Sequence, residues 1–572
     1  MALFRSSASL AFISCVTAFV VPVQAASETA SILGVSEEGL RRQEKIQNES
    51  LKQLQQKNST LSSEKNNDKN IALPDEDRCF LIERTIVRAS NDVEIGWISK
   101  EVEQFANHCI GVEGLKNIIA YLNEGLVEKG FVTSKVSLPR QNLRDGILKL
   151  QFHAGVVDTI VFSSKSNGEE KLKKGEHFFF PFTKGDILNI RDLEQGVENI
   201  SRLKSQTAKV RIVPGRQQDS SKVVLDRAVK AEDTLRGGIT LSNSGNRDVS
   251  KTQASVYIVN ENGLGIGDVF NISANSSVEK VDSENLSQSL SAQYSVPIGY
   301  SHLNFSHTYT RFSQVVSGTT ARFVSSGSSH STKANLKHTF YRDASTKVLL
   351  HGGLSFRSSN SFLDDIELLV QRRNTVNVDV GGRLEKHFSD GLAMEVDLSI
   401  RKGVGWFGAE HDLIDVVEGG ATLRPYIWNL SLDVKKPILS DSWLYSSRIY
   451  AQHTDDNILT NEQFSIGSRY SVRGFDGESV LLAESGLYWR NEWQKKPGSQ
   501  TEGSWYGGLD AGIVYGPSSG QLSGKSLVGM AFGWRGELKS IYIDASIGIP
   551  IIKPDAFETE KLNPYLSLVY EL

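Results

Sequence analysis

Features that would place this chain of 572 residues in several common classes are missing. Beyond residue 25 there is no run of about 18 apolar residues, the length that a membrane-spanning helix needs, so a helical membrane protein is excluded. The formal net charge is only −4 and no block of lysine or arginine is present, so we expect no nucleic-acid partner.

Motifs of common enzyme classes are absent as well. The sequence contains no Walker motif and no His-Glu-x-x-His pair. The glycine-rich stretch at 263–267 falls in a turn between expected strands and not at a strand-to-helix junction, so it does not indicate a nucleotide-binding loop. We therefore predict that the protein is not an enzyme and has no catalytic residues, no cofactor and no metal site.

Cysteine is scarce, and the first of only three lies in an N-terminal segment with the features of a secretory signal. Arg5 gives this segment a positive end, residues 10–21 form a short apolar stretch, and small residues up to Ala25 offer a cleavage site. We expect residues 1–25 to be removed and the mature chain to leave the cytoplasm.

The other two cysteines, Cys79 and Cys109, form an isolated pair. In an oxidising compartment such a pair favours a disulfide. Two buried free thiols are the alternative, and a zinc site lacks further ligands at suitable spacing. We therefore predict a structural disulfide between Cys79 and Cys109.

The region before the first of these cysteines is polar. Residues 26–57 contain a helix-prone run rich in glutamate, glutamine, lysine and arginine, with few apolar residues. A helix of this composition cannot be a core helix, so the run is either disordered or lies in an aqueous cavity. Residues 58–78 have the composition of a linker.

Two small α+β domains are predicted next, at 79–156 and 157–230. Apolar spacing in the first indicates a strand, two helical segments and two further strands, and the second repeats this order more loosely. The expected elements are at 80–87, 99–105, 115–127, 131–136 and 146–152 in the first domain, and at 157–162, 190–203, 208–213 and 221–225 in the second.

From residue 231 to 572, two-residue alternation replaces helical periodicity. In 391–404, for example, apolar residues alternate with charged or polar ones. The polar face of such a strand needs water and the apolar face needs lipid or a core. We place sixteen strands, at 233–244, 252–260, 267–275, 286–297, 300–311, 331–341, 346–357, 373–387, 391–404, 420–435, 442–453, 482–494, 504–516, 526–536, 539–549 and 563–572.

The links between these strands alternate in length. Short links such as 297–299 and 343–345 follow even-numbered strands, whereas long ones such as 312–330, 405–419 and 454–481 follow odd-numbered strands. Short turns on one side and long loops on the other are typical of outer-membrane barrels with an even strand count. We therefore predict a membrane β-barrel of 16 antiparallel strands.

The longest link carries a recognisable motif. Residues 471–478 read Ser-Val-Arg-Gly-Phe-Asp-Gly-Glu, which resembles the VRGF/Y signature of the BamA/TpsB superfamily. The flanks at 464–470 and 488–492 are similar to those of the two-partner secretion (TpsB) transporters of the haemolysin activation/secretion type.

The N-terminal half is similar to the same family. Residues 130–134 with 138–143 and Gly146 resemble the end of the family's first POTRA domain, and residues 185–195 resemble the helix entry of its second. The resemblance covers 79–572, with four separated motifs in the family's order.

The resemblance implies a protein in the outer membrane with two periplasmic POTRA domains, a plug helix at 26–57 and a 16-stranded barrel in outer-membrane lipid. Its implied function is to recognise a large partner exoprotein with an N-terminal secretion domain and to secrete it unfolded. The cargo could be an adhesin, a haemolysin or a contact-dependent toxin. An outer-membrane protein assembly factor of the BamA type is the alternative, disfavoured because such factors typically differ in domain number and lack a plug helix.

In this family the loop that bears Arg-Gly-Phe folds into the barrel lumen, and its arginine pairs with an aspartate of the thirteenth strand. The matching residues are Arg473, Gly474 and Phe475 on the loop and Asp510 on strand 504–516. The planar guanidinium suits a carboxylate, and a confined lumen screens the pair less than bulk water does. The alternative is an ordinary exposed arginine, whose ion pair would contribute little.

The two α+β domains would receive the substrate as a strand added to a sheet edge. We expect the groove beside the second helix of the first domain to bind it. The candidate residues are Leu115, Leu122, Phe131, Val132 and Val136. The alternative is that these residues belong to the core.

Overall fold

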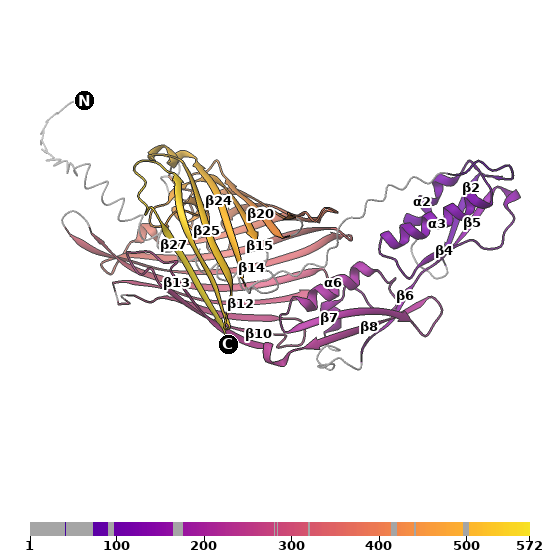
Figure 1. Ribbon diagram of the computed structural model, residues 1–572, viewed down its shortest axis with the longest axis horizontal. Coiled ribbons are helices and arrows are strands. Elements are labelled where there is room, and N and C mark those ends of the chain that lie inside the picture. The colour runs from indigo at the N-terminus through magenta and orange to yellow at the C-terminus, as the bar shows by residue number, and fades with distance from the viewer. Residues whose placement is uncertain are drawn as a thin grey trace, which may run out of the picture.

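The computed structural model describes Arg41 and residues 73–89, 96–163, 175–279, 281–282, 284–317, 321–412, 420–439, 442–495 and 503–572. A large barrel carries two small α+β domains in a row at one end (Figure 1). The expected signal peptide 1–25, the linker up to residue 72 and all of the segment 26–57 except Arg41 lie outside the described residues. Within these ranges, no helix is both long enough and apolar enough to cross a membrane.

The first domain contains two sheets and two helices. In one sheet β1 (Phe80–Ile82) pairs with β3 (His108–Ile110), and in the other the order is β2 (Arg84–Ala89), β5 (Ile147–His153), β4 (Lys135–Ser137). The helical elements are α2 (Gly96–Val102), η1 (Glu103–Phe105), α3 (Val112–Glu128) and η2 (Leu143–Asp145). Apolar residues of α3, spaced at the helical period, pack against β5, so the expected α+β fold is present.

The second domain repeats this plan with one sheet, ordered β6 (Val156–Phe162), β8 (Ser220–Val229), β7 (Gln206–Pro214). Its helices are α5 (Glu176–Phe179) and α6 (Ile190–Ser201). The side chain of Asn189 caps α6 by accepting a hydrogen bond of 2.9 Å from the N–H of Arg191. Gly196 of α6 leaves room for the ring of Phe180, so helix and core approach closely.

Sixteen long antiparallel strands of the described chain form the barrel. The barrel is closed because its first strand, β9, pairs with the second, β10, and also with the last, β27. The sixteen strands are β9 (Leu235–Ser242), β10 (Gln253–Glu261), β11 (Val269–Ser277), β12 (Leu286–Ile298), β13 (Ser301–Ser317), β14 (Arg322–Arg342), β15 (Thr346–Leu363), β17 (Arg373–His387), β18 (Ala393–Val404), β19 (Tyr426–Ile438), β20 (Trp443–His453), β23 (Ser485–Lys495), β24 (Gly503–Tyr515), β25 (Ser526–Leu538), β26 (Ile541–Ile552) and β27 (Asn563–Glu571). Shorter elements include β16 (Ile366–Glu367), η4 (Leu369–Gln371) and η7 (Pro517–Gln521) between these strands, and η3 (Ala231–Asp233) directly before β9.

Each barrel strand presents alternate residues to two faces. On β24, Trp505, Leu509 and Ile513 are exposed on the outer face, whereas Tyr506 and Asp510 are buried on the inner face. An apolar outer face and a polar inner face are the pattern that a barrel in lipid with a wet lumen requires. The sixteen-stranded barrel predicted from the alternation is therefore confirmed.

Some expected boundaries are wrong. Strands β13 and β14 stay paired up to Ser317 and Arg322, so 312–330 is mostly strand and not a long link. In this region the main chains of β13 and β14 stay paired although apolar residues no longer alternate on the outer face. The sequence shows the alternation but not the pairing, so it predicts strands that are too short. Strand β19 begins at Tyr426 and not at 420, and the strand expected at 131–136 is reduced to β4 because Ser134 N–H closes a turn on the carbonyl of Phe131.

Candidate functional site

The segment 454–484 between β20 and β23 folds into the barrel, and we call it the inward loop. It contains a 3-10 turn, η6 (Thr460–Glu462), and a small ribbon of β21 (Phe464–Ile466) and β22 (Leu481–Ala483). Its apolar side chains form a cluster with inward-facing residues of β24 and β25 and with Phe557, which lies between β26 and β27. The cluster consists of Phe464, Ile466, Val472, Phe475, Leu481, Ala483, Val514, Leu527 and Phe557. This cluster anchors the loop to one side of the lumen.

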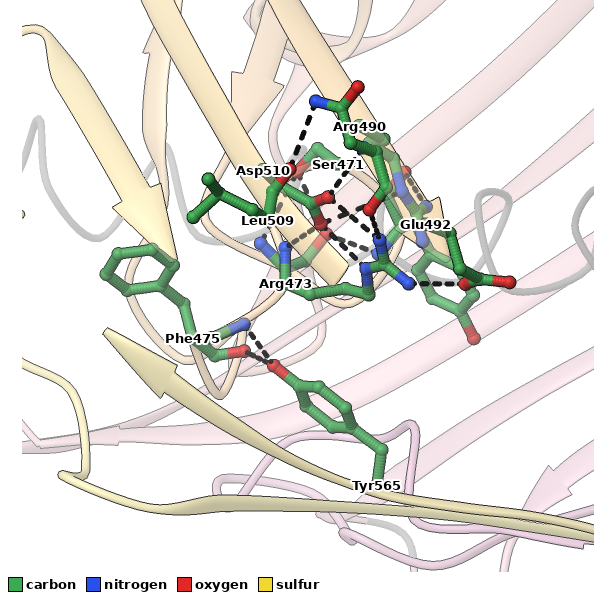
Figure 2. Close-up of polar contacts among 12 residues, drawn as sticks. Ser471, Arg473, Phe475, Arg490, Glu492, Leu509, Asp510 and Tyr565 are labelled. Carbon is green, nitrogen blue, oxygen red and sulfur yellow. Dashed lines mark hydrogen bonds and ion pairs between the residues drawn. The ribbon is translucent and has the colours of Figure 1, made fainter. Parts of the chain in front are cut away.

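Arg473 of the inward loop and Asp510 of β24, the thirteenth barrel strand, form a bidentate ion pair (Figure 2). Nε of Arg473 donates to Oδ2 of Asp510 at 2.7 Å, and Nη2 donates to Oδ1 at 2.8 Å. The main-chain N–H of Arg473 adds a third bond to Oδ2, at 2.9 Å. The side chain of Asp510 is fully buried and that of Arg473 is 6% exposed, so water screens the pair little.

A second acidic residue completes the setting of Arg473. Its Nη1 donates to Oε2 of Glu492 on β23 at 2.6 Å, and its Nη2 also reaches the carbonyl of Asn491. Burial by itself would lower the pKa of the Arg473 guanidinium, but Asp510 and Glu492 outweigh burial and raise that pKa above its ordinary value. Glu492 is shared with Arg535 of β25, so the loop joins a network of charges on the barrel wall.

Gly474 has two reasons to be glycine. Its φ is +114°, a left-handed conformation that other residues rarely adopt. A Cβ there would lie 2.6 Å from the carbonyl oxygen of Ile549 and 2.9 Å from Cα of Gly529. The loop backbone therefore lies directly against the inner faces of β25 and β26.

Tyr565 of the last strand holds the backbone of the motif (Figure 2). Its hydroxyl accepts a hydrogen bond of 3.0 Å from the N–H of Gly474 and donates one of 2.7 Å to the carbonyl of Phe475. Asn563 Nδ2 donates to the carbonyl of Gly474 at 2.7 Å. The fully buried ring of Phe475 packs edge-on against Phe557. Loop and closing strand are therefore joined by main-chain contacts as well as by packing.

Arg41 is the one described residue of segment 26–57, and it is helical. It lines a cavity together with Arg469 and Asp476 of the inward loop and with Ser287 and Gln253 of the barrel wall. The residue therefore lies inside the barrel, as a plug helix requires. A second cavity, of about 230 Å³, lies between Arg473 on the loop and strands β9–β11.

The second α+β domain is joined to one part of the barrel rim by polar contacts of α6. Glu198 binds Arg342 Nη1 at 2.7 Å and Lys347 Nζ at 2.6 Å, at the turn between β14 and β15. Asn199 Nδ2 donates to the carbonyl of Gly299 in the next turn at 2.8 Å. Asp192 accepts a bond of 2.6 Å from the hydroxyl of Tyr300. These contacts fix the domain beneath strands β12–β15.

Burial affects the acidic groups of this contact in different ways. Burial would raise the pKa of Glu198, but the positive charges of Lys347 and Arg342 outweigh it and hold that pKa below its ordinary value. For Asp192, burial prevails over the hydrogen bond from Tyr300 and raises the pKa. The interface therefore depends on an ionised Glu198.

The expected groove residues of the first domain do not lie together on its surface. The core of the first domain contains Leu115, Leu122 and Val136, because α3 turns its apolar face towards β5. For these three residues the alternative prediction, that they belong to the core, is therefore correct. Phe131 is partly buried and stacks on Trp97 at 5.8 Å between ring centroids, and Val132 is 37% exposed.

Cys79 and Cys109 are joined by a disulfide. The bridge ties the chain before β1 to β3, at the edge of the first domain where the chain enters it. The disulfide predicted from the isolated pair is present.

A closed sixteen-stranded barrel with an inward loop and two α+β domains in a row at one end defines an outer-membrane transporter. A family model for the haemolysin secretion/activation protein ShlB/FhaC/HecB matches residues 219–536, and two POTRA domain models, the first of ShlB type, match 80–155 and 156–214. The chain belongs to this family of two-partner secretion transporters. It is an outer-membrane protein with its POTRA domains in the periplasm.

Several relatives bear this out. The chain is 32% identical to "Outer membrane transporter CdiB-2" of Burkholderia pseudomallei strain 1026b, over 80% of this chain and 78% of that protein. It is 23% identical to "Hemolysin transporter protein ShlB" of Serratia marcescens, over 67% of this chain and 66% of that protein. Among solved structures, CdiB from Escherichia coli has the same fold, with a TM-score of 0.80, 23% identity and coverage of 94% of this chain and 98% of that one.

The structure adds residues that the sequence did not single out. Glu492 lies within a motif that did point to the family, and its place two residues after Arg490 puts both on the inner face. Tyr565 and Asn563 carry no motif, and alternation on β27 indicates only that they face inward. Their contact with the loop becomes visible only when the barrel closes.

Proposed function

We propose that this protein recognises one large exoprotein in the periplasm and passes it, unfolded, through the barrel to the cell surface. The observation that carries the proposal is the inward loop, tied to the wall by Arg473 and Asp510 inside a barrel whose rim holds a POTRA domain. A passive porin has no need of either feature. The relatives named CdiB and ShlB are transporters, which supports the same role here.

We further propose that the pair of Arg473 and Asp510 acts as a latch that sets the position of the loop during export. A bidentate pair in a confined site fixes geometry as well as charge, and removing one partner leaves a buried charge uncompensated. The helical Arg41, in contact with the same cavity as the loop, supports a plug at 26–57 that must leave before the cargo enters.

The first POTRA domain is proposed to bind the cargo at a sheet edge. Strands β2 and β4 are the edges of its three-stranded sheet, and an extended chain can pair with an edge through main-chain hydrogen bonds. Of the expected groove residues, Val132 is exposed beside β4 and Phe131 lies next to it, so we assign the contact to them and not to the buried Leu115, Leu122 or Val136.

The proposed division of the chain is a signal peptide at 1–25, a plug helix at 26–57, a linker at 58–78, POTRA domains at 79–156 and 157–230, and the barrel at 231–572. We propose no catalytic activity. Export then draws no energy from the transporter, and folding of the cargo outside the cell would prevent its return.

Co-expression tests the function. The chain is expressed in a Gram-negative host with the large exoprotein encoded beside it, and the exoprotein is measured in the medium by immunoblot. Accumulation in the medium only when the chain is present supports the proposal. Retention of the exoprotein in the periplasm despite a correctly assembled barrel would contradict it.

A further inference from the structure

The inner face of the barrel differs sharply from one side to the other. Between Asn271 and Ser277 on β11, between Ser287 and Ser295 on β12 and between Asn304 and Thr310 on β13, every inward-facing position is a hydroxyl or amide residue. We call this surface the neutral wall, and it consists of Asn271, Ser273, Asn275, Ser277, Ser287, Ser289, Ser291, Gln293, Ser295, Asn304, Ser306, Thr308 and Thr310. No acidic or basic residue occurs among these positions.

Another part of the inner face, on β17–β20, is lined by paired charges. On β17 and β18, Arg401 binds Asp379 at 2.9 Å and Arg383 binds Asp397 at 2.8 Å. On β19 and β20, Asp433 binds Arg448 at 2.6 Å. We call this surface, the inward positions of β17–β20, the charged wall. The inward loop lies beyond it, against β23–β26, where its arginine joins the same kind of network.

The second POTRA domain contacts the end of the neutral wall that is nearest to the periplasm. Arg202, directly after α6, donates from Nη1 to Oγ of Ser295, the lowest hydroxyl of the neutral wall, at 2.8 Å. Asn199 contacts Gly299 in the turn between β12 and β13. The second POTRA domain therefore lies directly against this end of the neutral wall.

The space in front of the neutral wall is enclosed by the loop. The cavity that Arg41 lines has Ser287 of the neutral wall on one side and Arg469 and Asp476 of the inward loop on the other. Two polar atoms of the wall, Asn271 Oδ1 and Thr310 Oγ1, are buried without a hydrogen-bond partner.

We propose that the exported polypeptide travels along the neutral wall, between it and the inward loop, and that the charged wall serves to hold the barrel strands together. This inference rests on the proposed function and names the surface on which it is carried out. The partner that the surface fits is an extended chain of mixed sequence.

The physical reason is that an unfolded cargo carries charges of both signs. Fixed charges in a confined lumen would bind complementary side chains strongly and stall the chain. Hydroxyl and amide groups exchange hydrogen bonds with water or with a backbone at little net cost, so they resemble the solvent that the cargo leaves. A neutral polar wall therefore allows movement without a preferred stopping point.

Photocrosslinking can locate the path with matched positions. A photoreactive phenylalanine analogue replaces Ser291 or Ser306 on the neutral wall, or the inward-facing Ser399 or Ser431 on the charged wall. The probe is the exoprotein used in the co-expression test, fused at its C-terminus to a tightly folded domain that stalls it in the pore. We expect adducts at Ser291 and Ser306 several-fold above those at Ser399 and Ser431.

Equal adducts on both walls, or stronger ones at Ser399 and Ser431, would overturn the inference while leaving the export function intact. Failure of the unsubstituted chain to export the exoprotein would instead contradict the function. Charge substitution gives a second measurement. Ser291→Arg should slow export by roughly five- to tenfold because it creates a binding point for acidic residues, whereas Ser431→Arg should change it little. The reverse order would also contradict the path.

Discussion

The carboxylate of Asp510 accepts three hydrogen bonds from Arg473, two from its guanidinium and one from its main-chain N–H, although the residues are 37 positions apart. The carboxylate therefore recognises the conformation of the loop backbone as well as the arginine side chain. Among the polar contacts of Arg473, the pair with Asp510 therefore constrains the inward loop most, because it holds the main chain and the side chain together.

Removing the guanidinium should release the loop. Arg473→Ala leaves the fully buried Asp510 uncompensated, which costs about 3–5 kcal/mol for a buried pair. We expect export to fall at least tenfold while the barrel still assembles, as heat-modifiable migration on gels would report. Arg473→Lys should be nearly as defective because it lacks the planar fork.

Arg247→Ala is the matched control, because Arg247 binds Glu478 of the same loop but its side chain is 47% exposed. An exposed pair contributes about 1 kcal/mol or less, so export should stay close to that of the unsubstituted protein. An equal loss of export in Arg247→Ala and Arg473→Ala would show that export does not depend specifically on the buried pair of Arg473 and Asp510.

Gly474→Ala should disturb the loop, and Gly477→Ala should not do so to the same degree. Both glycines have positive φ, at +114° and +83°. A Cβ at Gly474 would meet the carbonyl of Ile549 at 2.6 Å, whereas at Gly477 the nearest atom is 3.6 Å away. Protease accessibility of the loop in intact cells and export are the measurements, and equal effects of the two substitutions would refute the close approach at Gly474.

The hydroxyl of Tyr565 should stabilise the loop. Tyr565→Phe leaves the N–H of Gly474 without its partner, at a cost of about 1–3 kcal/mol. We expect faster hydrogen exchange at 473–476 in detergent or nanodiscs. Tyr570→Phe is the control, because Tyr570 lies on the exposed outer face of the same strand and should leave this exchange unchanged.

Acid should loosen the second POTRA domain from the rim. Lys347 and Arg342 hold the pKa of Glu198 below its ordinary value of 4.5, so the docked state favours the ionised carboxylate. The stabilisation is complete above about pH 4.5 and is lost as the pH falls through the lower pKa of the docked state.

Pulsed electron resonance distances between labels on α6 and the rim can follow this loosening, with broadening expected only at acid pH. Glu198→Gln should broaden the distances already at pH 7, because Arg342 then lacks its main partner. Asp226→Asn on β8, which alters a contact with Arg211 on β7, should not. A distance distribution that is the same at both pH values would contradict the role of Glu198.

The disulfide should stabilise the first POTRA domain only. It closes a loop with a sequence separation of 30, worth about 3–4 kcal/mol in the chain-entropy account. Cys79→Ser should raise protease sensitivity within 73–155 of the full-length protein and leave the barrel resistant. Unaltered sensitivity would mean that the hydrophobic core alone holds this domain.

Much of the fold was predictable because lipid imposes a simple rule. Each membrane strand must turn apolar residues outward at every second position, so β18 and β26 can be recognised from the sequence alone. The rule fails where a strand extends past the apolar layer, so the alternation predicts a link where β13 and β14 remain paired up to Ser317 and Arg322. The strand predicted at 131–136 begins too early for another reason: the turn at Phe131 interrupts an apolar run that resembles a strand.

The site was predictable only as far as a motif reached. Arg473 and Asp510 could be paired through the family resemblance, and the structure brings them together. Tyr565 and Asn563 reach the loop because barrel closure places β27 beside it, and no local pattern encodes that. The sequence cannot separate core from groove at Leu115 and Leu122, because their spacing fits a core face and a binding face of α3 equally well, and the structure places both in the core.

The most direct test of the whole account compares export by the unsubstituted chain with export by Arg473→Ala at equal amounts of assembled barrel. Both are co-expressed with the exoprotein encoded beside the chain, and the exoprotein is quantified in the medium. The account predicts secretion with the unsubstituted chain and at least a tenfold loss with Arg473→Ala. Undiminished secretion by Arg473→Ala would contradict it.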